Sequence, residues 1–387
     1  MAAVILITLF LSFLYAGLLL FYRHAFQTMP VFQKGVSRLS TSISVIIPAR
    51  NEEANIARCI DSLLQQSYPD SLFEIIVADD HSEDDTANII KKYSDKNVQL
   101  LSVKDHVSGH INSYKKKAIQ LAIAQAKGTL IVTTDADCYL PPHCLETIAA
   151  FYEEKKPAFI AAPVSIDCGN RFIEIFQALD FMSLQGITAA VVSKKQMTMC
   201  NGANMAYERA SFYDVNGFTG IDDIASGDDM LLMHKIYKRY PERVLFLKSP
   251  EAIVQTAPVQ SVREFFNQRI RWASKADKYN DIRILPVLLL VFLLNLLLVL
   301  IPIIALFRNE RPTFIGYQFS MIQTWFIILI IKTLAELIFL FPVAKFFHKK
   351  FLLWLFPVMQ PFHIIYTVIA GGLGKFGTYK WKGRKVK

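Results

Sequence analysis

The sequence predicts an α/β domain with a mostly parallel sheet and helices on both faces, joined to helices that cross a membrane. Two observations support this fold class. Between residues 43 and about 280, short apolar runs alternate with stretches of helical spacing, as in the crossover units of a parallel sheet. In addition, 53% of the 387 residues are hydrophobic, against roughly 45–50% in an average soluble chain, and long apolar stretches lie at both ends.

The first half of the domain is expected to contain four buried strands separated by helices. Each strand is a short apolar run, which is typical of a strand covered on both faces. The strands are expected at residues 43–48, 73–78, 98–103 and 129–134. Three helices are expected between these strands. The first covers residues 52–66, the second begins after Ser82, which would be its N-cap, and the third covers residues 116–126.

Apolar stretches long enough to cross a membrane flank this domain. Residues 2–22 carry no charge, and a helix of about 20 residues spans roughly 30 Å of hydrocarbon. Because basic residues follow this stretch and none precedes it, we expect a retained anchor and not a cleaved signal peptide. Residues 284–307 and 314–343 are expected to form two further spans, and residues 351–373 form a third apolar segment interrupted by prolines and glycines.

The charge distribution predicts the orientation in the membrane. Residues 22–41, 345–350 and 375–387 contain 12 basic residues and no acid, which leaves 30 basic against 33 acidic residues elsewhere. Acid-free basic segments beside spans lie on the cytoplasmic side, so the domain is expected in the cytoplasm, on an inner or plasma membrane. A third full span would place the basic tail outside. We therefore expect residues 351–373 to be a re-entrant or interfacial hairpin, with a true span as the alternative.

The resulting domain division is an anchor at residues 1–22, a basic linker at 23–42, the α/β domain at 43–259, an amphipathic interfacial helix at 260–283, a membrane region at 284–374 and a basic tail at 375–387. Membrane lipid is thus an expected partner. The slightly acidic domain lacks the clustered Lys and Arg of a nucleic-acid surface, so nucleic acid is excluded. The five cysteines form no C-x-x-C pair, which favours free thiols in a reducing compartment.

Acidic residues follow two of the expected strands. Asp79 and Asp80 end the second strand, and Asp135 and Asp137 follow the fourth. In parallel sheets, ligands bind beyond the carboxyl ends of the strands. No glycine-rich dinucleotide fingerprint and no phosphate-binding P-loop occurs. Carboxylate oxygens suit Mg²⁺ or Mn²⁺, which in turn bind phosphates.

Seven motifs occur in an order that resembles one enzyme family. They are VIIPARNEE (45–53), IIVADDHSEDDT (75–86), GHINSYKKKA (109–118), TTDADCYLPP (133–142), CNGANMAYER (200–209), SGDDMLL (226–232) and QRIRW (268–272). Together they resemble the family 2 glycosyltransferases, whose fold is called GT-A, and the flanking spans resemble its membrane-bound branch. The resemblance covers residues 43 to about 280.

The resemblance implies a site for a nucleotide-sugar donor, either a UDP- or a GDP-sugar. The residues implied to bind the donor nucleotide are Pro48, Ala49, Asn51, Glu53, Asp80, Lys116 and Asp135. Asp79 is expected to be structural, and Lys116 is taken from a basic patch of three lysines near the diphosphate. Asp137 is implied to coordinate a divalent ion, Mg²⁺ or Mn²⁺, which stabilises the charge on the leaving diphosphate.

The resemblance also implies the catalytic and acceptor residues. Asp229 would be the general base, with Asp228 in the place of the family's usual Glu. The simpler interpretation is that both acids only complement the dipole of the helix that they begin. The residues implied to contact the sugars and the diphosphate are Gly202, Asn204, Gln268, Arg271 and Trp272.

These features predict an inverting hexosyltransferase that acts on a lipid or glycan acceptor during the synthesis of cell envelope polysaccharide or glycolipid. The alternative is a processive polysaccharide synthase that couples polymerisation to export, which Q-x-x-R-W favours. A transporter or non-catalytic scaffold is a third hypothesis. Its only support is the charged pair Lys332 and Glu336 within an expected span.

Overall fold

A computed structural model describes residues 2–35, 38–107, 112–224, 227–274, 281–307, 313–314, 317–318, 320–376, 379–381 and 384–386. The chain divides into two compact units. The helical unit comprises Met1–Thr28, Gly169–Ala190 and Val259–Thr378, and the α/β unit comprises Met29–Cys168, Val191–Pro258 and Tyr379–Lys387. The start of the lysine motif (109–111), Ser226 and much of the basic tail lie outside the described residues.

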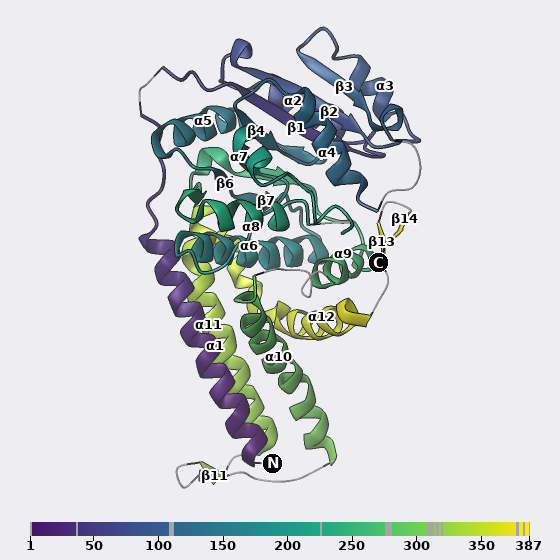
Figure 1. Cartoon of the computed structure of the whole chain (residues 1–387). Helices are drawn as coiled ribbons and strands as arrows, with labels where there is room; N and C mark the ends of the chain where they lie inside the picture. Colours follow the sequence, from purple (N-terminus) through teal and green to yellow (C-terminus); the bar gives the residue numbers. More distant parts are fainter. Residues whose placement is uncertain are drawn as a thin grey trace. The chain divides into compact units, whose positions relative to one another are not determined.

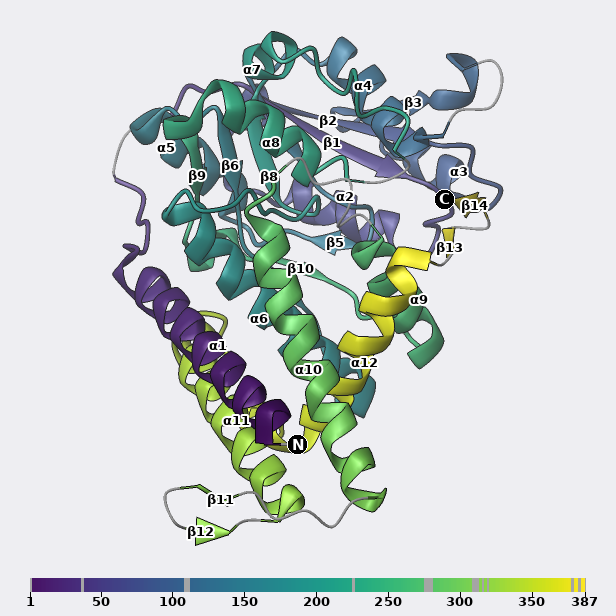
Figure 2. The same ribbon diagram turned by 60° about the horizontal axis from the view of Figure 1, so that its bottom comes forward.

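The α/β unit is built on a seven-stranded sheet of order β3-β2-β1-β4-β8-β6-β9, whose strands are labelled across Figures 1 and 2. Its strands are β1 (Ile43–Ala49), β2 (Phe73–Asp79), β3 (Val98–Ser102), β4 (Leu130–Thr133), β6 (Phe159–Ala161), β8 (Met205–Glu208) and β9 (Val244–Phe246). Only β8 runs antiparallel to its neighbours. The mostly parallel α/β fold expected from the sequence is therefore confirmed.

The core of this unit lies around the central strands. The Ile46 and Ile47 side chains of β1 and the Ile76 side chain of β2 have no exposed surface, because α4 packs on β1 and β2 and other helices cover the sheet (Figure 1). The helices are α2 (Ile56–Leu64), α3 (Thr86–Lys91), α4 (Tyr114–Gln125), α5 (Cys144–Lys155), α7 (Arg209–Asp214) and α8 (Met230–Arg239), with short 3-10 turns at Asp70–Leu72, Val103–Asp105, Pro241–Arg243 and Pro250–Ala252.

A second, smaller sheet has the order β5-β10-β7. Its strands are β5 (Cys138–Tyr139), β7 (Val164–Ile166) and β10 (Val254–Thr256). The backbone also forms two short hairpins, β11 (Thr313–Phe314) with β12 (Tyr317–Gln318), and β13 (Tyr379–Trp381) with β14 (Arg384–Val386). The smaller sheet matters for the site, because β5 begins directly after Asp137 and β10 ends beside it.

One expected helix start is wrong. Ser82 does not cap a helix, since α3 begins at Thr86 with Asp85 at its N-cap. The Ser82 hydroxyl instead accepts a hydrogen bond from the backbone N of Asn51 at 3.0 Å. The Ser82 backbone N donates to Asp79 Oδ1 at 3.3 Å, so Asp79 holds the loop and does not cap the helix directly. The loop after β2 uses these side chains to bind the loop after β1.

The helical unit contains α1 (Ala2–Thr28), α6 (Phe172–Ser193), α9 (Val262–Ala273), α10 (Ile284–Phe307), α11 (Met321–Phe346) and α12 (Phe356–Phe376), with a 3-10 turn at Lys350–Trp354. In the described part of the chain, α1, α6, α10, α11 and α12 are long and apolar enough to cross a membrane. The most apolar window of α6 is 78% buried, against 28% for α1, so α6 presents little surface to lipid.

Helices α1 and α11 lie side by side along their lengths (Figures 1 and 2). The rings of Phe26 and Phe346 meet edge to face at 5.9 Å. Gly186 of α6 lies so close to α11 that an added Cβ would meet Val343 Cγ2 at 2.6 Å. Small residues of this kind let membrane helices approach each other closely.

The third apolar segment differs from the expected hairpin. One continuous helix, α12, covers most of it, and Pro361 lies within that helix. The 3-10 turn Lys350–Trp354 precedes this helix. Whether α12 crosses the membrane or lies along it stays a prediction, as do the domain boundaries.

Candidate active site

Acidic residues meet where the strands of the larger sheet end. Ala49, the last residue of β1, is in register with Asp79 of β2. The Asp80 backbone N donates to the Ala49 carbonyl oxygen at 2.7 Å. On its other side β1 pairs in parallel with β4, after which Asp135 and Asp137 follow. The two acid pairs therefore follow β2 and β4, the parallel strands on either side of β1, at the same carboxyl edge of the sheet.

Lys115 links the D-x-D to the second acid pair. Its Nζ lies 2.8 Å from Asp135 Oδ1 and 3.1 Å from Asp228 Oδ2. Burial by itself lowers the pKa of Lys115, but the Asp135 and Asp228 carboxylates outweigh burial and raise that pKa above its ordinary value. Lys115 is therefore a permanent cation in an acidic centre formed by β4, α4 and the start of α8.

Lys116, the lysine expected at the donor nucleotide, does not lie in this centre. Its Nζ donates to the carbonyl oxygens of Ile221 at 2.5 Å and Ile224 at 2.7 Å, and the residue is 1% exposed. Neighbouring residues of a helix with 3.6 residues per turn point in directions about 100° apart. Only one of the consecutive lysines of α4 can therefore face the acids, and it is Lys115. The expectation for Lys116 is corrected accordingly.

Asp229 is the N-cap residue of α8. Its Oδ1 accepts from the Met230 backbone N at 2.7 Å, and its Oδ2 accepts from the Gly202 backbone N at 3.3 Å. A Cβ added to Gly202 would lie 3.4 Å from Asp228 Oδ2 and 3.5 Å from Lys115 Nζ. Gly202 thus lies where the acids and the lysine meet, and its contact with a sugar or the diphosphate stays a prediction. Asp229 both caps the helix and keeps lone pairs for a further proton donor.

Asn204 has a structural position. Its side-chain nitrogen donates to the carbonyl oxygens of Pro163 and Ala252, at 2.8 Å each, and the residue is 1% exposed. The Asn204 side chain therefore connects the start of β8 to the segments that precede β7 and β10. The expectation that this side chain contacts a sugar is corrected.

Asp137 has the chemistry of a metal ligand. Its Oδ2 accepts from the Thr256 hydroxyl of β10 at 3.4 Å, and its Oδ1 accepts from the Cys138 thiol at 3.7 Å. Both donors are neutral, and a carboxylate has lone pairs for more than two partners. Among the described residues no group of three or more His, Cys, Asp or Glu side chains forms a complete metal site. The residues fit an ion whose other ligands come from a phosphate and water.

Asn51 and Glu53 join the two loops that follow β1 and β2. Asn51 Oδ1 accepts from the Glu83 backbone N at 2.8 Å, and Glu53 Oε2 accepts from the Asp85 backbone N at 3.0 Å. Asn51 has a φ of 50°, a left-handed conformation that Asn tolerates. The side chains of both residues shape the loops, and Pro48 and Ala49 lie at the end of β1 beside them.

Arg50 is a site residue that the sequence reasoning missed. Its Nη1 donates to the carbonyl oxygens of Asp80 and His81, at 2.9 Å each. The Asp80 carboxylate lies 2.9 Å from His81 Nδ1. The sequence signal for this role is the position of Arg50 directly after the buried strand β1. A guanidinium at that place needs hydrogen-bond acceptors. Arg50 fixes the loop that presents Asp80.

Gln268, Arg271 and Trp272 lie on α9 in the helical unit. This helix begins with a capping box, in which the Ser261 hydroxyl accepts from the Glu264 backbone N. Gln268 Oε1 accepts from Arg269 Nη1 at 2.8 Å. The side chain of Trp272 is partly buried. Residues 262–273 of the expected interfacial helix form α9, and the position of this helix at a membrane surface stays a prediction.

The sequence of this chain is similar to those of known glycosyltransferases. The family model described as "Glycosyl transferase family 2" matches residues 44–215, and "Glycosyl transferase family group 2" matches residues 130–364. The probable glycosyltransferase YdaM of Bacillus subtilis is 25% identical over 257 residues, which cover 64% of this chain and 58% of YdaM. Poly(ribitol-phosphate) beta-N-acetylglucosaminyltransferase TarS of Staphylococcus aureus is 34% identical over 112 residues, which cover 29% of this chain and 19% of TarS.

The chain thus matches less than two thirds of the length of these relatives. Among solved structures, a mannosyltransferase from Pyrobaculum calidifontis, determined with GDP-Man and Mn²⁺, has a TM-score of 0.55 and 17% identity, covering 97% of this chain and 98% of that chain. This likeness concerns the fold. Since one family model covers more than half of the sequence, the chain belongs to the family 2 glycosyltransferases.

Proposed function

We propose that the protein transfers a sugar from a nucleotide-sugar donor to a hydroxyl group of a lipid or glycan acceptor, with inversion, at the cytoplasmic face of a membrane. The observation that carries this proposal is the position of Lys115 between Asp135 and Asp228. Lys115 therefore links Asp135, which is expected at the donor, to the Asp228 and Asp229 pair, which is expected at the acceptor hydroxyl. In a direct displacement the attacking and the leaving group act on the same carbon, so the donor and acceptor sites must adjoin.

In this proposal Asp229 accepts the proton of the acceptor hydroxyl. The acceptor oxygen then attacks the anomeric carbon. The bond from that carbon to the diphosphate oxygen breaks on the opposite face, and the diphosphate leaves with the electron pair. Lys115 supplies positive charge next to this group. Asp137 would hold the divalent ion, which adds further stabilisation of the diphosphate charge when bound.

The donor and the acceptor are proposed at the level of chemical class. The P. calidifontis mannosyltransferase was determined with GDP-Man and Mn²⁺, and the name of TarS states N-acetylglucosamine transfer to poly(ribitol-phosphate). These relatives support a UDP- or GDP-hexose donor, a divalent metal ion and a glycan-type acceptor. The assignment of Gln268, Arg271 and Trp272 to the acceptor and diphosphate, and of Pro48, Ala49, Asn51, Glu53 and Asp80 to the nucleotide, rests on the sequence motifs.

A processive synthase is the second candidate, because Gln268, Arg271 and Trp272 match the Q-x-x-R-W motif, which such enzymes carry. It shares the site chemistry and differs in the number of sugars added per acceptor. The transporter hypothesis has lost its support. Lys332 and Glu336 are buried and paired with each other at 2.7 Å, so their presence within a helix is explained by the pair itself and does not call for a transported ion.

The test is a donor screen on the purified full-length protein in lipid nanodiscs, with UDP- and GDP-hexoses and Mg²⁺ or Mn²⁺. We expect nucleoside diphosphate release that EDTA abolishes and that Mn²⁺ restores, and a fall of about 100-fold or more in the Asp137→Asn variant. Mass spectrometry of the product separates one added sugar from a polymer. Full activity in EDTA, or in the Asp137→Asn variant, would exclude the proposed role of the metal ion.

A further inference from the structure

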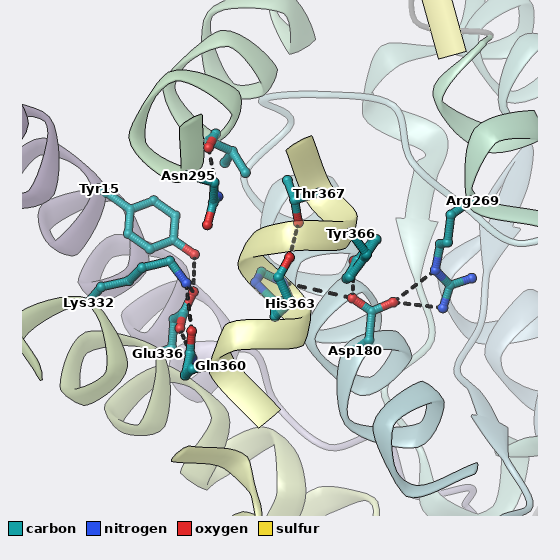
Figure 3. A network of polar contacts seen from close by, with 11 residues as sticks. Tyr15, Asp180, Arg269, Asn295, Lys332, Glu336, Gln360, His363, Tyr366 and Thr367 are labelled. Carbon is teal, nitrogen blue, oxygen red and sulfur yellow. Dashed lines mark hydrogen bonds and ion pairs between the residues drawn. The ribbon is translucent and has the colours of Figure 1, made fainter. Parts of the chain in front are cut away.

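A buried ion pair holds helix α9 to helix α6. Arg269 Nε and Nη2 donate to Asp180 Oδ2 at 3.0 and 2.6 Å, and both side chains are only 4% exposed (Figure 3). Burial of two charges costs free energy, so the pair is tolerated only with close geometry and further hydrogen bonds. Arg269 is one of the two variable positions of Q-x-x-R-W, so the motif itself assigns it no role.

The guanidinium of Arg269 is stacked between two rings of its own helix. Its Cζ lies 4.6 Å from the centre of the Phe265 ring and 4.2 Å from the centre of the Trp272 ring. A cation over the face of Trp is attracted by the ring, more strongly where water is excluded. One face of the Trp272 ring is therefore covered by Arg269, while the Phe181 ring lies at 6.2 Å and is tilted by 43°.

The other oxygen of Asp180 is held by α12. The Tyr366 hydroxyl donates to Asp180 Oδ1, and His363 Nε2 lies 3.9 Å from the same oxygen (Figure 3). The Tyr366 ring also meets the Phe265 ring edge to face at 5.2 Å. Asp180 therefore connects α6, α9 and α12 through charged and hydrogen-bonding groups in a buried place.

We propose that Asp180 and Arg269 are positioning residues that fix the orientation of the Trp272 ring, and through it the binding of the acceptor. Arg269 is oriented by Asp180 and in turn covers one face of Trp272. Without the carboxylate, the buried guanidinium must find another partner or water, and its plane is no longer fixed against the indole. This inference rests on the proposed function, in which Trp272 contacts the acceptor sugar.

The first test measures Trp272 without any assay of activity. In a full-length protein carrying Trp325→Phe, Trp354→Phe and Trp381→Phe, Trp272 is the only fluorophore of its type. Asp180→Asn is expected to shift its emission to longer wavelength and to increase its quenching by acrylamide. Arg269→Lys keeps the charge but loses the planar stacking group, so it should act in the same direction.

The matched control is Glu336→Gln. Glu336 is also a buried carboxylate paired with a buried cation in the helical unit, at 2.7 Å from Lys332. This variant should lower stability while the emission and quenching of Trp272 remain unchanged. If Asp180→Asn fails to fold, Tyr366→Phe takes its place, because it removes one of the hydrogen bonds that hold the Asp180 carboxylate. Unchanged Trp272 emission and quenching in Arg269→Lys and in Asp180→Asn, or in Tyr366→Phe in its place, overturns the inference.

The second test uses kinetics and separates the inference from the proposed function. Asp180→Asn should raise the KM for the acceptor and lower transfer by about 10–100-fold, with an unchanged KM for the donor and unchanged donor hydrolysis in the absence of acceptor. If the wild type transfers no sugar, the proposed function fails, whereas the fluorescence test still applies. If the wild type is active and Asp180→Asn changes donor and acceptor parameters equally, the positioning role is wrong.

Discussion

Lys115 and Lys116 have the same side chain and opposite environments. Lys115 lies between the carboxylates of Asp135 and Asp228, while Lys116 donates to two backbone carbonyls of the segment before α8. Lys115 therefore lies in the acidic centre, whereas Lys116 holds a loop. The residue type therefore says little about the role, and the direction of the side chain decides it.

Substitution of these two lysines should separate activity from stability. Lys115→Met is expected to lower transfer by about 100–1000-fold, as loss of a charged group at a transition state does. Lys116→Met is expected to lower the free energy of unfolding by about 1–3 kcal/mol, because two buried carbonyls lose their donor. Activity per folded protein and thermal unfolding measure the two effects. Equal loss of activity in both folded variants would contradict this division.

The thiols should differ strongly in reactivity. Burial raises the pKa of Cys144 to about 12 and raises that of Cys59 well above its ordinary range. Burial and the charges of Asp137 and Asp135 raise the pKa of Cys138 in the same way. A raised pKa means less thiolate at a given pH, and the thiolate is the reactive form.

We therefore expect N-ethylmaleimide at pH 7.5 to label the half-exposed Cys168 before Cys59, Cys138 or Cys144. Mass spectrometry of the labelled native protein locates the adduct, and the urea-unfolded protein is the control in which every thiol should react. If Cys144 is labelled equally fast in the native and the unfolded protein, the Cys144 thiol is not buried.

At the scale of elements, α8 combines a helix cap with the proposed base. Asp229 accepts from the Met230 backbone N as N-cap, and Asn is about as good as Asp at this position. Asp229→Asn should therefore keep the stability of the helix but abolish transfer, because an amide does not accept the proton. Asp229→Ala should lose both activity and about 1 kcal/mol of stability.

Thermal unfolding and activity of the two Asp229 variants form the comparison. If the Asp229→Asn protein folds and is fully active, Asp229 is not the general base and another group has that role. A folded and inactive Asp229→Asn protein with wild-type stability would show that the carboxylate has a chemical role beyond capping the helix.

At the scale of the whole molecule, the basic segments predict one orientation. The positions between α10 and α11 in the sequence should lie outside, and the lysines after α11 should lie in the cytoplasm. In a cysteine-free variant, Asn309→Cys should react with a membrane-impermeant maleimide in intact cells, whereas Lys349→Cys should react only after permeabilisation. Labelling of Lys349→Cys in intact cells would reverse the proposed orientation and place the site on the outer side.

Local sequence features were enough to predict the first four strands of the larger sheet and the edge that carries the acids, and the seven ordered motifs indicated the family. Apolar runs and acids such as Asp80 and Asp135 are local features, and each forms its element or strand end from neighbouring residues. These properties depend on short-range spacing and on burial that any parallel sheet imposes.

Packing of the elements against each other determines which side chains act together. The sequence could not choose between Lys115 and Lys116, because the choice depends on what faces each side of α4. It could not show that Asn204 is used by the Pro163 and Ala252 carbonyls, or that Asp180 holds Arg269 from 89 residues away. Contacts between residues distant in sequence form only when the elements pack, and a spacing pattern contains no information about the partner.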